Sequence, residues 1–322
     1  MSHAEVFQIT IIGAGTIGLS FAALHLLKHV SHPGLRLVIH DTRSGLEQYV
    51  LETLPVYIQC KLTKQEQTEA LSYLVAVEDH IHMHELIISS SNLQTAVAEA
   101  DIVQEQGPEN VSFKTLLWPK VEQHCPPNAL LWSSTSGIPA SIQSADMTDP
   151  SRLIVVHPYN PPHVMPLLEI IPSPITDPDV ISRTMQFWEV KDMAPIVLRK
   201  EPTGFVANRL AFALLREAIH LVREGVTTVK DIDDLMTSSM GPRWAVAGIF
   251  KSYHAGGGPS GLEGFFQNIG GTVQACWDDL GQVNVGEGWE GDIFRQTKEA
   301  YGIVDIKARD EKTRKVLAAA RS

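Results

Sequence analysis

Short apolar runs alternate with amphipathic stretches over the first two hundred residues of the chain. The apolar runs have the length of buried strands, and one stretch between them, starting at Ile17 and containing AALHLLKHV, has the spacing of a helix. Strands and helices in alternation predict a parallel sheet with crossover helices. The predicted strands are Phe7 to Ile12, Leu37 to His40, Asp101 to Val103, Ala129 to Trp132, Leu153 to Val156 and Pro195 to Arg199.

The pattern changes after Glu201-Pro202-Thr203-Gly204, which breaks the run of strands. A helical pattern then extends from Phe205 to Glu224, and further helical stretches with glycine-rich interruptions follow. This part lacks runs of β-branched residues, so we expect it to be helical. The sequence therefore predicts an α/β fold of two domains. Residues 1–200 form a doubly wound parallel sheet, and residues 201–322 form a smaller all-α domain.

Composition narrows the class of protein. The chain has 322 residues, of which 44% are hydrophobic and 20% charged, as in an ordinary globular protein. A formal charge of −11 without a Lys/Arg-rich run argues against nucleic acid or an anionic membrane as a partner. We find no signal peptide and no apolar run of 18 residues, so we expect a cytoplasmic protein. Three widely separated cysteines fit a reducing compartment and no CxxC metal site: Cys60, Cys125 and Cys276.

A glycine-rich turn lies between the first predicted strand and the first predicted helix. Its GxGxxG spacing is that of dinucleotide-binding (Rossmann) domains. In that motif the three glycines allow a tight turn, a close approach to the pyrophosphate and close packing of helix on strand. The N–H groups at the helix start then face the phosphates. The alternative is a turn without a ligand. The candidate cofactor-binding residues are Gly13, Gly15, Thr16, Ile17 and Gly18.

An acidic residue ends the second predicted strand. Asp41 lies 23 residues beyond Gly18, where a carboxylate accepts hydrogen bonds from the adenosine ribose. Because a carboxylate repels a 2′-phosphate, the sequence favours NAD over NADP as the cofactor. Arg43, two residues on, leaves NADP open as the alternative.

Chemically active side chains follow three further predicted strands. Ligands of an open parallel sheet bind outside the carboxyl ends of its strands, so we expect these groups to converge on one edge. They are the carboxylates Glu105 and Glu109 with Lys114 nearby, the hydroxyl run Ser133-Ser134-Thr135-Ser136-Gly137, and the histidine that opens HPYNPP.

That histidine, His157, can transfer a proton near neutral pH, and Glu169 can orient its imidazole. The alternative is that His157 caps its strand and that Glu169 is a solvated strand residue. Ser136, the last hydroxyl before Gly137, is the one best placed to point into the cleft. A turn that merely satisfies its own backbone is the alternative for this run.

Asn208 offers a separate indication. On the predicted helix it shares a face with Phe212, Leu215 and Ile219. An amide on an apolar face needs a partner, since leaving it unsatisfied costs about 1–3 kcal/mol. The partner is either the protein backbone or, as the functional interpretation has it, a substrate bound between the domains.

Taken together, these motifs resemble those of the L-3-hydroxyacyl-CoA dehydrogenase family. GAGTIG, Asp41, VQEQGPEN, SSTSG, HPYNPP and GFVANRL occur here in the family's order and span nearly the whole chain. The resemblance implies a doubly wound N-terminal domain and a helical C-terminal domain that dimerises. It also implies a catalytic set and two further cofactor contacts. By motif, the catalytic residues are Ser136, His157, Glu169 and Asn208, and the cofactor contacts are Glu109 and Lys114.

One segment departs from the fatty-acid enzymes of this family. Met240-Gly241-Pro242-Arg243-Trp244-Ala245 resembles the branch with λ-crystallin, an L-gulonate 3-dehydrogenase, and L-carnitine dehydrogenase, which oxidise small free hydroxy acids. A guanidinium at Arg243 can bind such a carboxylate bidentately, whereas a surface salt bridge is the alternative. A trimethylammonium substrate would need a cage that Trp244, Phe250 and Tyr253 could supply, although such aromatics also serve as core.

We therefore expect NAD-dependent oxidation of a small L-3-hydroxy acid such as gulonate, carnitine or 3-hydroxybutyrate. One alternative is a short-chain L-3-hydroxyacyl-CoA dehydrogenase, whose CoA needs a basic patch. A non-catalytic, NAD-binding structural protein of the crystallin kind is the alternative from another class. It predicts decay of the four catalytic positions, yet all four are filled with the expected residue types.

Overall fold

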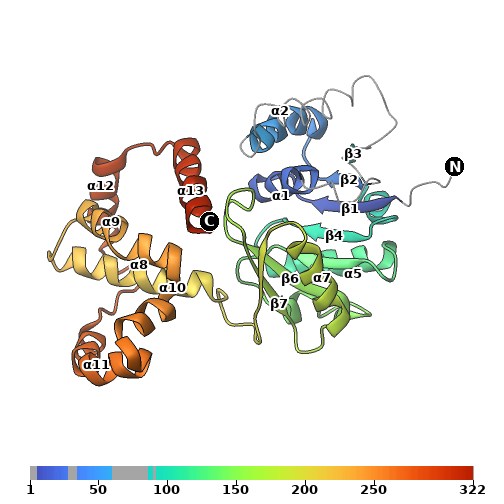
Figure 1. Ribbon diagram of the computed structural model, residues 1–322. Coiled ribbons are helices and arrows are strands. Elements are labelled where there is room, and N and C mark those ends of the chain that lie inside the picture. Colours follow the sequence, from blue (N-terminus) through green and yellow to red (C-terminus); the bar gives the residue numbers. More distant parts are fainter. Residues whose placement is uncertain (1–5, 28–34, 60–85, 90–91, 322) are drawn as a thin grey trace. The chain divides into compact units, whose positions relative to one another are not determined.

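A computed structural model describes residues 6–27, 35–59, 86–89 and 92–321. Contacts between residues divide the chain into two compact units, Met1–Ala207 and Asn208–Ser322. The strands belong to the first unit, and α8 to α13 belong to the second (Figure 1). Cys60 lies outside the described residues.

The first unit is built on an eight-stranded sheet in the order β3-β2-β1-β4-β5-β6-β7-β8. The first six strands in chain order run parallel, as predicted. β7 returns antiparallel to β6, and β8 is parallel to β7. The strands are β1 (Phe7–Ile12), β2 (Leu35–His40), β3 (Leu86–Ser89), β4 (Ile102–Glu105), β5 (Leu130–Ser133), β6 (Leu153–Pro158), β7 (Leu167–Pro172) and β8 (Ala194–Val197).

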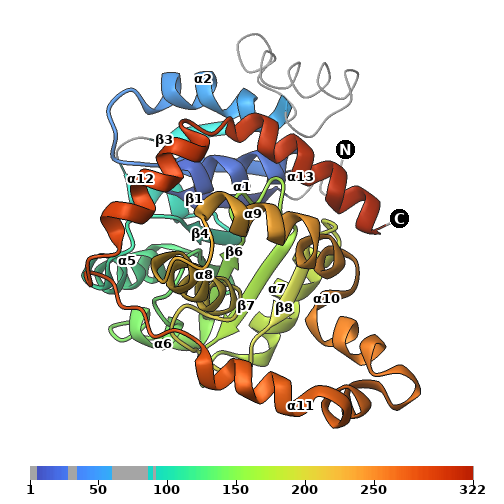
Figure 2. The same ribbon diagram turned by 90° about the vertical axis from the view of Figure 1, so that its left-hand side faces the viewer.

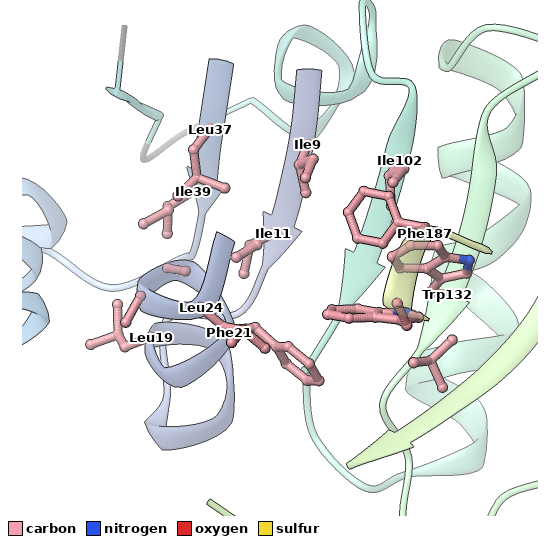
Figure 3. Close-up of a cluster of buried hydrophobic side chains, with 14 of the residues drawn as sticks. Ile9, Ile11, Leu19, Phe21, Leu24, Leu37, Ile39, Ile102, Trp132 and Phe187 are labelled. Carbon is pink, nitrogen blue, oxygen red and sulfur yellow. The ribbon is translucent and has the colours of Figure 1, made fainter. Parts of the chain in front are cut away.

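Helices cover both faces of this sheet, because apolar residues occupy both sets of alternating positions along its strands. On one face, Ile9 and Ile11 of β1 pack with helices α1, α2 and α7 in a single buried cluster. Figure 3 shows part of it, including Phe187 of α7 beside Trp132 of β5, with ring centroids 5.1 Å apart. The helices are α1 (Thr16–Leu27), α2 (Leu46–Gln59) and α7 (Pro178–Glu189).

The opposite face carries a second buried cluster. Val103 of β4 and Leu131 of β5 pack there with Trp118 of α5 and with Phe205, which precedes the second unit. The two clusters give the sheet its doubly wound form. The elements on this side are α4 (Leu93–Val97), α5 (Val111–His124) and α6 (Ala140–Gln143), and the short 3-10 turn η2 (Pro150–Arg152) leads into β6.

Two strands of the sheet were not predicted, namely β3 and β7. β7 is the sequence LLEIIP, whose central Glu169 interrupts the apolar run at the place where a polar residue is least expected. In the structure this glutamate is only 2% exposed, so the interpretation of Glu169 as a solvated strand residue is wrong.

The described residues of the second unit form helices and no strands, which confirms the all-α prediction (Figure 2). Its first helix begins at Ala207 rather than at Phe205, because Gly204 and Phe205 have positive φ values of 74° and 55°. Gly248 breaks α10 with a non-helical φ of 66°. The helices are α8 (Ala207–Arg223), α9 (Val229–Ser238), α10 (Met240–Gly256), α11 (Gly261–Asp279), α12 (Glu290–Tyr301) and α13 (Ile306–Arg321), with the turn η3 (Gly258–Ser260) before α11.

Within the described ranges, the helices include none with the length and apolar character needed to span a membrane.

Candidate active site

His157 and Glu169 come from adjacent antiparallel strands and lie opposite each other in the register of β6 and β7. The side chains of directly opposed residues are within contact distance in such a pair. His157 Nδ1 lies 2.8 Å from Glu169 Oε2, and both residues are buried. A carboxylate only accepts hydrogen bonds, so Nδ1 carries the proton and Nε2 is left as the basic nitrogen.

The other carboxylate oxygen of Glu169 binds the start of α8. Glu169 Oε1 accepts hydrogen bonds from the N–H groups of Val206 at 2.8 Å and Ala207 at 3.0 Å. Burial alone would raise the pKa of Glu169, but the hydrogen bonds from His157, Ala207 and Val206 outweigh it and lower that pKa. Glu169 is therefore ionised at neutral pH and can stabilise a positively charged imidazole.

The segment before α8 also contributes to the surroundings of His157. The ring of Phe205 lies 5.2 Å from the imidazole, centroid to centroid, and is fully buried. Apart from the preceding Gly204, nothing in the sequence indicated that Phe205 has a positive φ.

Glu109 binds the hydroxyl-rich turn that follows β5. Its Oε1 accepts from Thr135 Oγ1 at 2.5 Å and from the N–H groups of Ser136 and Gly137 at 3.0 and 3.1 Å. The hydroxyl of Ser136 lies 3.2 Å from the same oxygen. A Cβ built on Gly137 would lie 4.0 Å from the backbone nitrogen of Gly204, so this turn borders the segment that leads into α8.

Lys114 is completely buried in an ion pair with Glu105, at 2.7 and 2.8 Å from its two oxygens. Glu105 also accepts from the N–H of Gly107 and from Ser133 Oγ, at 2.6 and 2.8 Å. Lys114 Nζ lies 4.0 Å from Glu109 Oε2. The sequence placed Glu105 at this edge but gave it no role, although a strand-end carboxylate nine residues before a lysine was a usable signal.

The glycine turn has the geometry that a pyrophosphate requires. Gly13 has a φ of 101°, and a Cβ there would lie 2.8 Å from the carbonyl oxygen of Gln106. A Cβ on Gly18 would lie 1.9 Å from the carbonyl oxygen of Gly13, so only glycine allows this approach. Gly15 has open space where a Cβ would stand, next to the helix start at Thr16 and Ile17. These residues fit a dinucleotide.

Asp41 lies just beyond β2 and contacts the same turn. Its Oδ2 accepts from the N–H of Ala14 at 2.7 Å, and its Oδ1 accepts from the N–H of Arg43 at 2.9 Å. Burial raises the pKa of Asp41, but these hydrogen bonds and the Arg43 guanidinium outweigh it and lower the pKa. A carboxylate offers about four acceptor positions, so Asp41 keeps capacity for a ribose hydroxyl.

The remaining candidates belong to the second unit. Asn208 lies in the first turn of α8 and is half-buried, whereas Phe212 and Leu215 on its predicted face are exposed. Arg243 is exposed in the first turn of α10, and it forms no ion pair with any residue that the structure describes. The aromatic candidates occupy the same helix: Trp244 is half-buried, while Phe250 and Tyr253 are exposed.

The site combines a glycine turn, an acid just beyond the second strand and a buried His–Glu pair on the same side of the sheet, outside the carboxyl ends of the parallel strands. This combination defines the class of a dinucleotide-dependent oxidoreductase. Residues 8–201 match the family model for the 3-hydroxyacyl-CoA dehydrogenase NAD binding domain, and residues 204–285 match the model for its C-terminal domain. The chain belongs to the 3-hydroxyacyl-CoA dehydrogenase family. It is an NAD-dependent oxidoreductase that acts on the CH–OH group of a 3-hydroxy acid.

Curated relatives carry two different names. A 3-hydroxyacyl-CoA dehydrogenase of Gibberella moniliformis is 32% identical over 86% of this chain and 81% of its own. An L-carnitine dehydrogenase of Pseudomonas putida is 31% identical over 99% of this chain and 95% of its own. Another, from Burkholderia mallei, is 36% identical over 70% of this chain and 72% of its own.

Solved structures share the fold. The 5-dehydrogenase of 5-formyl-3-hydroxy-2-methylpyridine 4-carboxylic acid, described as an NAD⁺-dependent dismutase, has a TM-score of 0.74 and is 26% identical. That similarity covers 98% of both chains. An (S)-3-hydroxybutyryl-CoA dehydrogenase of Ralstonia eutropha is 25% identical, with a TM-score of 0.60 over 72% of this chain and 77% of its own.

Proposed function

We propose that the protein oxidises the 3-hydroxyl of a small, free L-3-hydroxy acid to the 3-oxo acid. The buried pair of His157 and Glu169 is the observation that carries this proposal. His157 lies near the carboxyl end of β6, and the glycine turn follows the carboxyl end of β1 in the same parallel part of the sheet. Bound NAD supplies the hydride acceptor for this oxidation. The class of substrate includes gulonate, carnitine and 3-hydroxybutyrate.

His157 takes the proton of the substrate hydroxyl at Nε2, since Nδ1–H is donated to Glu169. Glu169 keeps the ring in this tautomer and stabilises the imidazolium as it forms. Two backbone N–H groups hold the carboxylate in place while this charge develops.

Other residues orient the two ligands. Ser136 and Asn208 donate hydrogen bonds to the substrate oxygen. Residues 1–200 form the cofactor domain and residues 201–322 the substrate and dimerisation domain. The cofactor contacts are Gly13, Gly15, Thr16, Ile17, Gly18, Asp41, Glu109 and Lys114. For Lys114 the contact is indirect in our proposal, because its ammonium is buried against Glu105.

Arg243 binds the substrate carboxylate. Its exposure and the absence of an ion pair with the described residues support this role, because the guanidinium keeps its donors for an anion. By name, several relatives act on carnitine, a free hydroxy acid, and one solved structure is a dehydrogenase of a carboxylic acid. The λ-crystallin-like branch remains part of this proposal.

The test is reduction of NAD by the purified protein with L-gulonate, L-carnitine, L-3-hydroxybutyrate and L-3-hydroxybutyryl-CoA. We expect turnover of a free acid and a rise in KM of about 10- to 100-fold in Arg243→Ala, as for loss of a charged hydrogen-bonded pair. Lys251→Ala, in the same helix, is the matched control and should behave as the wild type.

Turnover of the thioester alone would indicate that the protein acts in acyl-CoA metabolism and that Arg243 has a structural role. NADH binding without turnover of any of the four compounds would favour the non-catalytic alternative. The fluorescence of NADH is used to monitor turnover, and it also measures the binding of NADH.

We propose a homodimer formed through the second unit, acting in the cytoplasm. Large apolar side chains lie exposed on the helices of this unit, as a protein–protein interface requires. Examples are Phe212 on α8, Phe250 on α10 and Trp277 on α11, which are 60%, 78% and 56% exposed.

A further inference from the structure

One ammonium group lies between two carboxylates just beyond the carboxyl end of β4. Lys114 Nζ is 2.7 and 2.8 Å from the two oxygens of Glu105, but 4.0 Å from Glu109 Oε2. Lys114 and Glu105 are buried, whereas Glu109 is exposed. Because water screens buried charges poorly, it matters which of the two carboxylates binds this ammonium.

The buried carboxylate of Glu105 is occupied by the protein on both sides. Its Oε1 accepts from Lys114 and from the N–H of Gly107, and its Oε2 accepts from Lys114 and from Ser133 Oγ. A carboxylate has about four acceptor positions, so little capacity remains for a ligand. The effect of Glu105 on the site is therefore exerted through its neighbours.

The second carboxylate, that of Glu109, is occupied by the turn after β5. Its Oε1 accepts from Thr135 Oγ1 and from the N–H groups of Ser136 and Gly137. A charged hydrogen bond to an ammonium is about 2.7–2.9 Å long, so the 4.0 Å from Lys114 to Glu109 Oε2 is too far for one. To pair closely with Lys114, Glu109 would have to move away from the turn.

We propose that Glu105 is a positioning residue of the active site. It binds Lys114, and this leaves Glu109 on the turn of residues 135–137, where it holds Ser136. The consequence for catalysis rests on the proposed function, in which Ser136 contacts the substrate. The competition of two carboxylates for one ammonium does not depend on that function.

Glu105→Gln tests this competition, because an amide has nearly the shape of a carboxylate but no charge. The buried ammonium then draws Glu109 away from the turn. We expect hydrogen exchange at residues 134–138 to accelerate about tenfold or more, and kcat at saturating NAD to fall about tenfold. Exchange at residues 148–149, a turn bound by Glu122, should keep the wild-type rate.

Two double variants distinguish this competition from a general loss of stability. In Glu105→Gln/Lys114→Met no ammonium competes for Glu109, so exchange at 134–138 should return most of the way to the wild-type rate, and kcat at saturating NAD should recover with it. In Glu105→Gln/Glu109→Ala exchange should be no faster than in Glu109→Ala alone, because both substitutions act through the same carboxylate. Independent structural roles would instead give additive effects.

Asp101→Asn is the matched control. Asp101 directly precedes β4, at the opposite end of this strand from Glu105, and its Oδ2 accepts from the N–H of Gln8 at 2.8 Å. This variant should keep the wild-type exchange at 134–138 and the wild-type kcat. If Glu105→Gln does not fold, Glu105→Asp replaces it. The shorter carboxylate keeps its charge but withdraws from Lys114, so exchange should change in the same direction and Lys114→Met should reverse the change.

The inference and the proposed function fail in different ways. Unaltered exchange at 134–138 in a folded Glu105 variant, an acceleration that Lys114→Met does not reverse, or additive effects with Glu109→Ala would overturn the inference. Accelerated exchange with an unchanged kcat would overturn the positioning role. A folded wild type that oxidises no hydroxy acid would overturn the proposed function, while the exchange rates would still decide whether Glu105 keeps Glu109 on the turn.

Discussion

At the scale of single residues, Glu169 divides its two oxygens between a side chain and the backbone. One oxygen receives Nδ1–H of His157, and the other receives the N–H groups of Val206 and Ala207. Each contact removes freedom from the carboxylate, so the imidazole is oriented before a substrate arrives. A substitution at Glu169 therefore affects both the orientation of the histidine and the start of α8.

For His157→Ala we expect kcat to fall by about 10²–10⁴-fold, the usual contribution of a general base. The Kd for NADH should be unchanged, because the glycine turn and Asp41 are untouched. Steady-state kinetics and fluorescence titration measure the two quantities. His220→Ala, which removes a histidine near Arg223 in the second unit, is the control and should retain turnover. Turnover like that of the wild type in His157→Ala would remove His157 from the mechanism.

At the scale of elements, the sequence predicted the parallel strands other than β3, but not the antiparallel return of β7. Local alternation identifies a strand, whereas its direction depends on which neighbour it joins, and nothing in LLEIIP specifies β6. The motifs did place Glu105, Glu109 and the hydroxyl run at one edge, because parallel strands align their carboxyl ends. The hydrogen bonds among them depend on side-chain geometry that spacing does not encode.

Glu109 ties the turn after β5 to the loop before α5. In Glu109→Ala the N–H of Ser136 loses its carboxylate acceptor, and the N–H of Gly137 keeps only the longer bond to Thr135 Oγ1, so we expect their amide hydrogen exchange to accelerate about tenfold or more. We also expect kcat to fall, since Ser136 is no longer held. Exchange measured by mass spectrometry over residues 134–138 tests the first effect.

Glu122→Ala provides a matched control for this variant. Glu122 of α5 accepts from the N–H groups of Thr148 and Asp149 at 2.7 and 2.6 Å, so it binds backbone N–H groups as Glu109 does, but at another turn. Its loss should accelerate exchange at 148–149 and leave kcat unchanged. Unaltered exchange at 134–138 in Glu109→Ala would show that the carboxylate does not order the turn.

His25 joins α1 to the sheet through a 2.9 Å hydrogen bond to Gln104 of β4. Burial lowers its pKa to about 3, with the charge of Lys191 acting in the same direction. The unfolded chain takes up this proton below its ordinary value of about 6.5, whereas the folded chain does not until about pH 3. The protonation of His25 therefore leaves the free energy of unfolding unchanged above pH 6.5. As the pH falls below 6.5, it lowers that free energy by up to about 1.4 kcal/mol per pH unit.

In His25→Gln the free energy of unfolding should be lower at pH 7.5, because the packing against Phe21 and Trp188 is lost. Its decline between pH 6.5 and 5.5 should be shallower than in the wild type. Urea unfolding at several pH values measures both, and His124→Gln serves as the control with a wild-type slope. Parallel curves for His25→Gln and the wild type would contradict the assignment.

At the scale of the whole molecule, the two units differ in how they bury their apolar residues. Both faces of the sheet in the first unit are covered by its own helices, and the large hydrophobic side chains that its described residues expose are aliphatic. Helices of the second unit also expose aromatic side chains, such as Phe250 and Trp277. This contrast assigns the association of subunits to the second unit in our proposal.

We expect light scattering after size exclusion to give a mass of about twice the 35.4 kDa of one chain. Phe250→Glu should shift the protein towards the monomer, because a carboxylate buried in an apolar interface is costly. Leu116→Glu changes a side chain of similar exposure on the first unit, 63%, and should leave the mass unchanged. A monomeric wild type would refute the dimer.

The bond from Glu169 to the start of α8 has a consequence for protein engineering. A chimera that joins the cofactor unit of this protein to the second unit of a relative invites a splice near residue 200, where the strands end. That splice would take Phe205, Val206 and Ala207 from the other parent, although Phe205 fills the core of the first unit and the next two residues bind Glu169. A crossover placed after Ala207 instead keeps His157, Glu169 and the two N–H groups that bind Glu169 in a single parent.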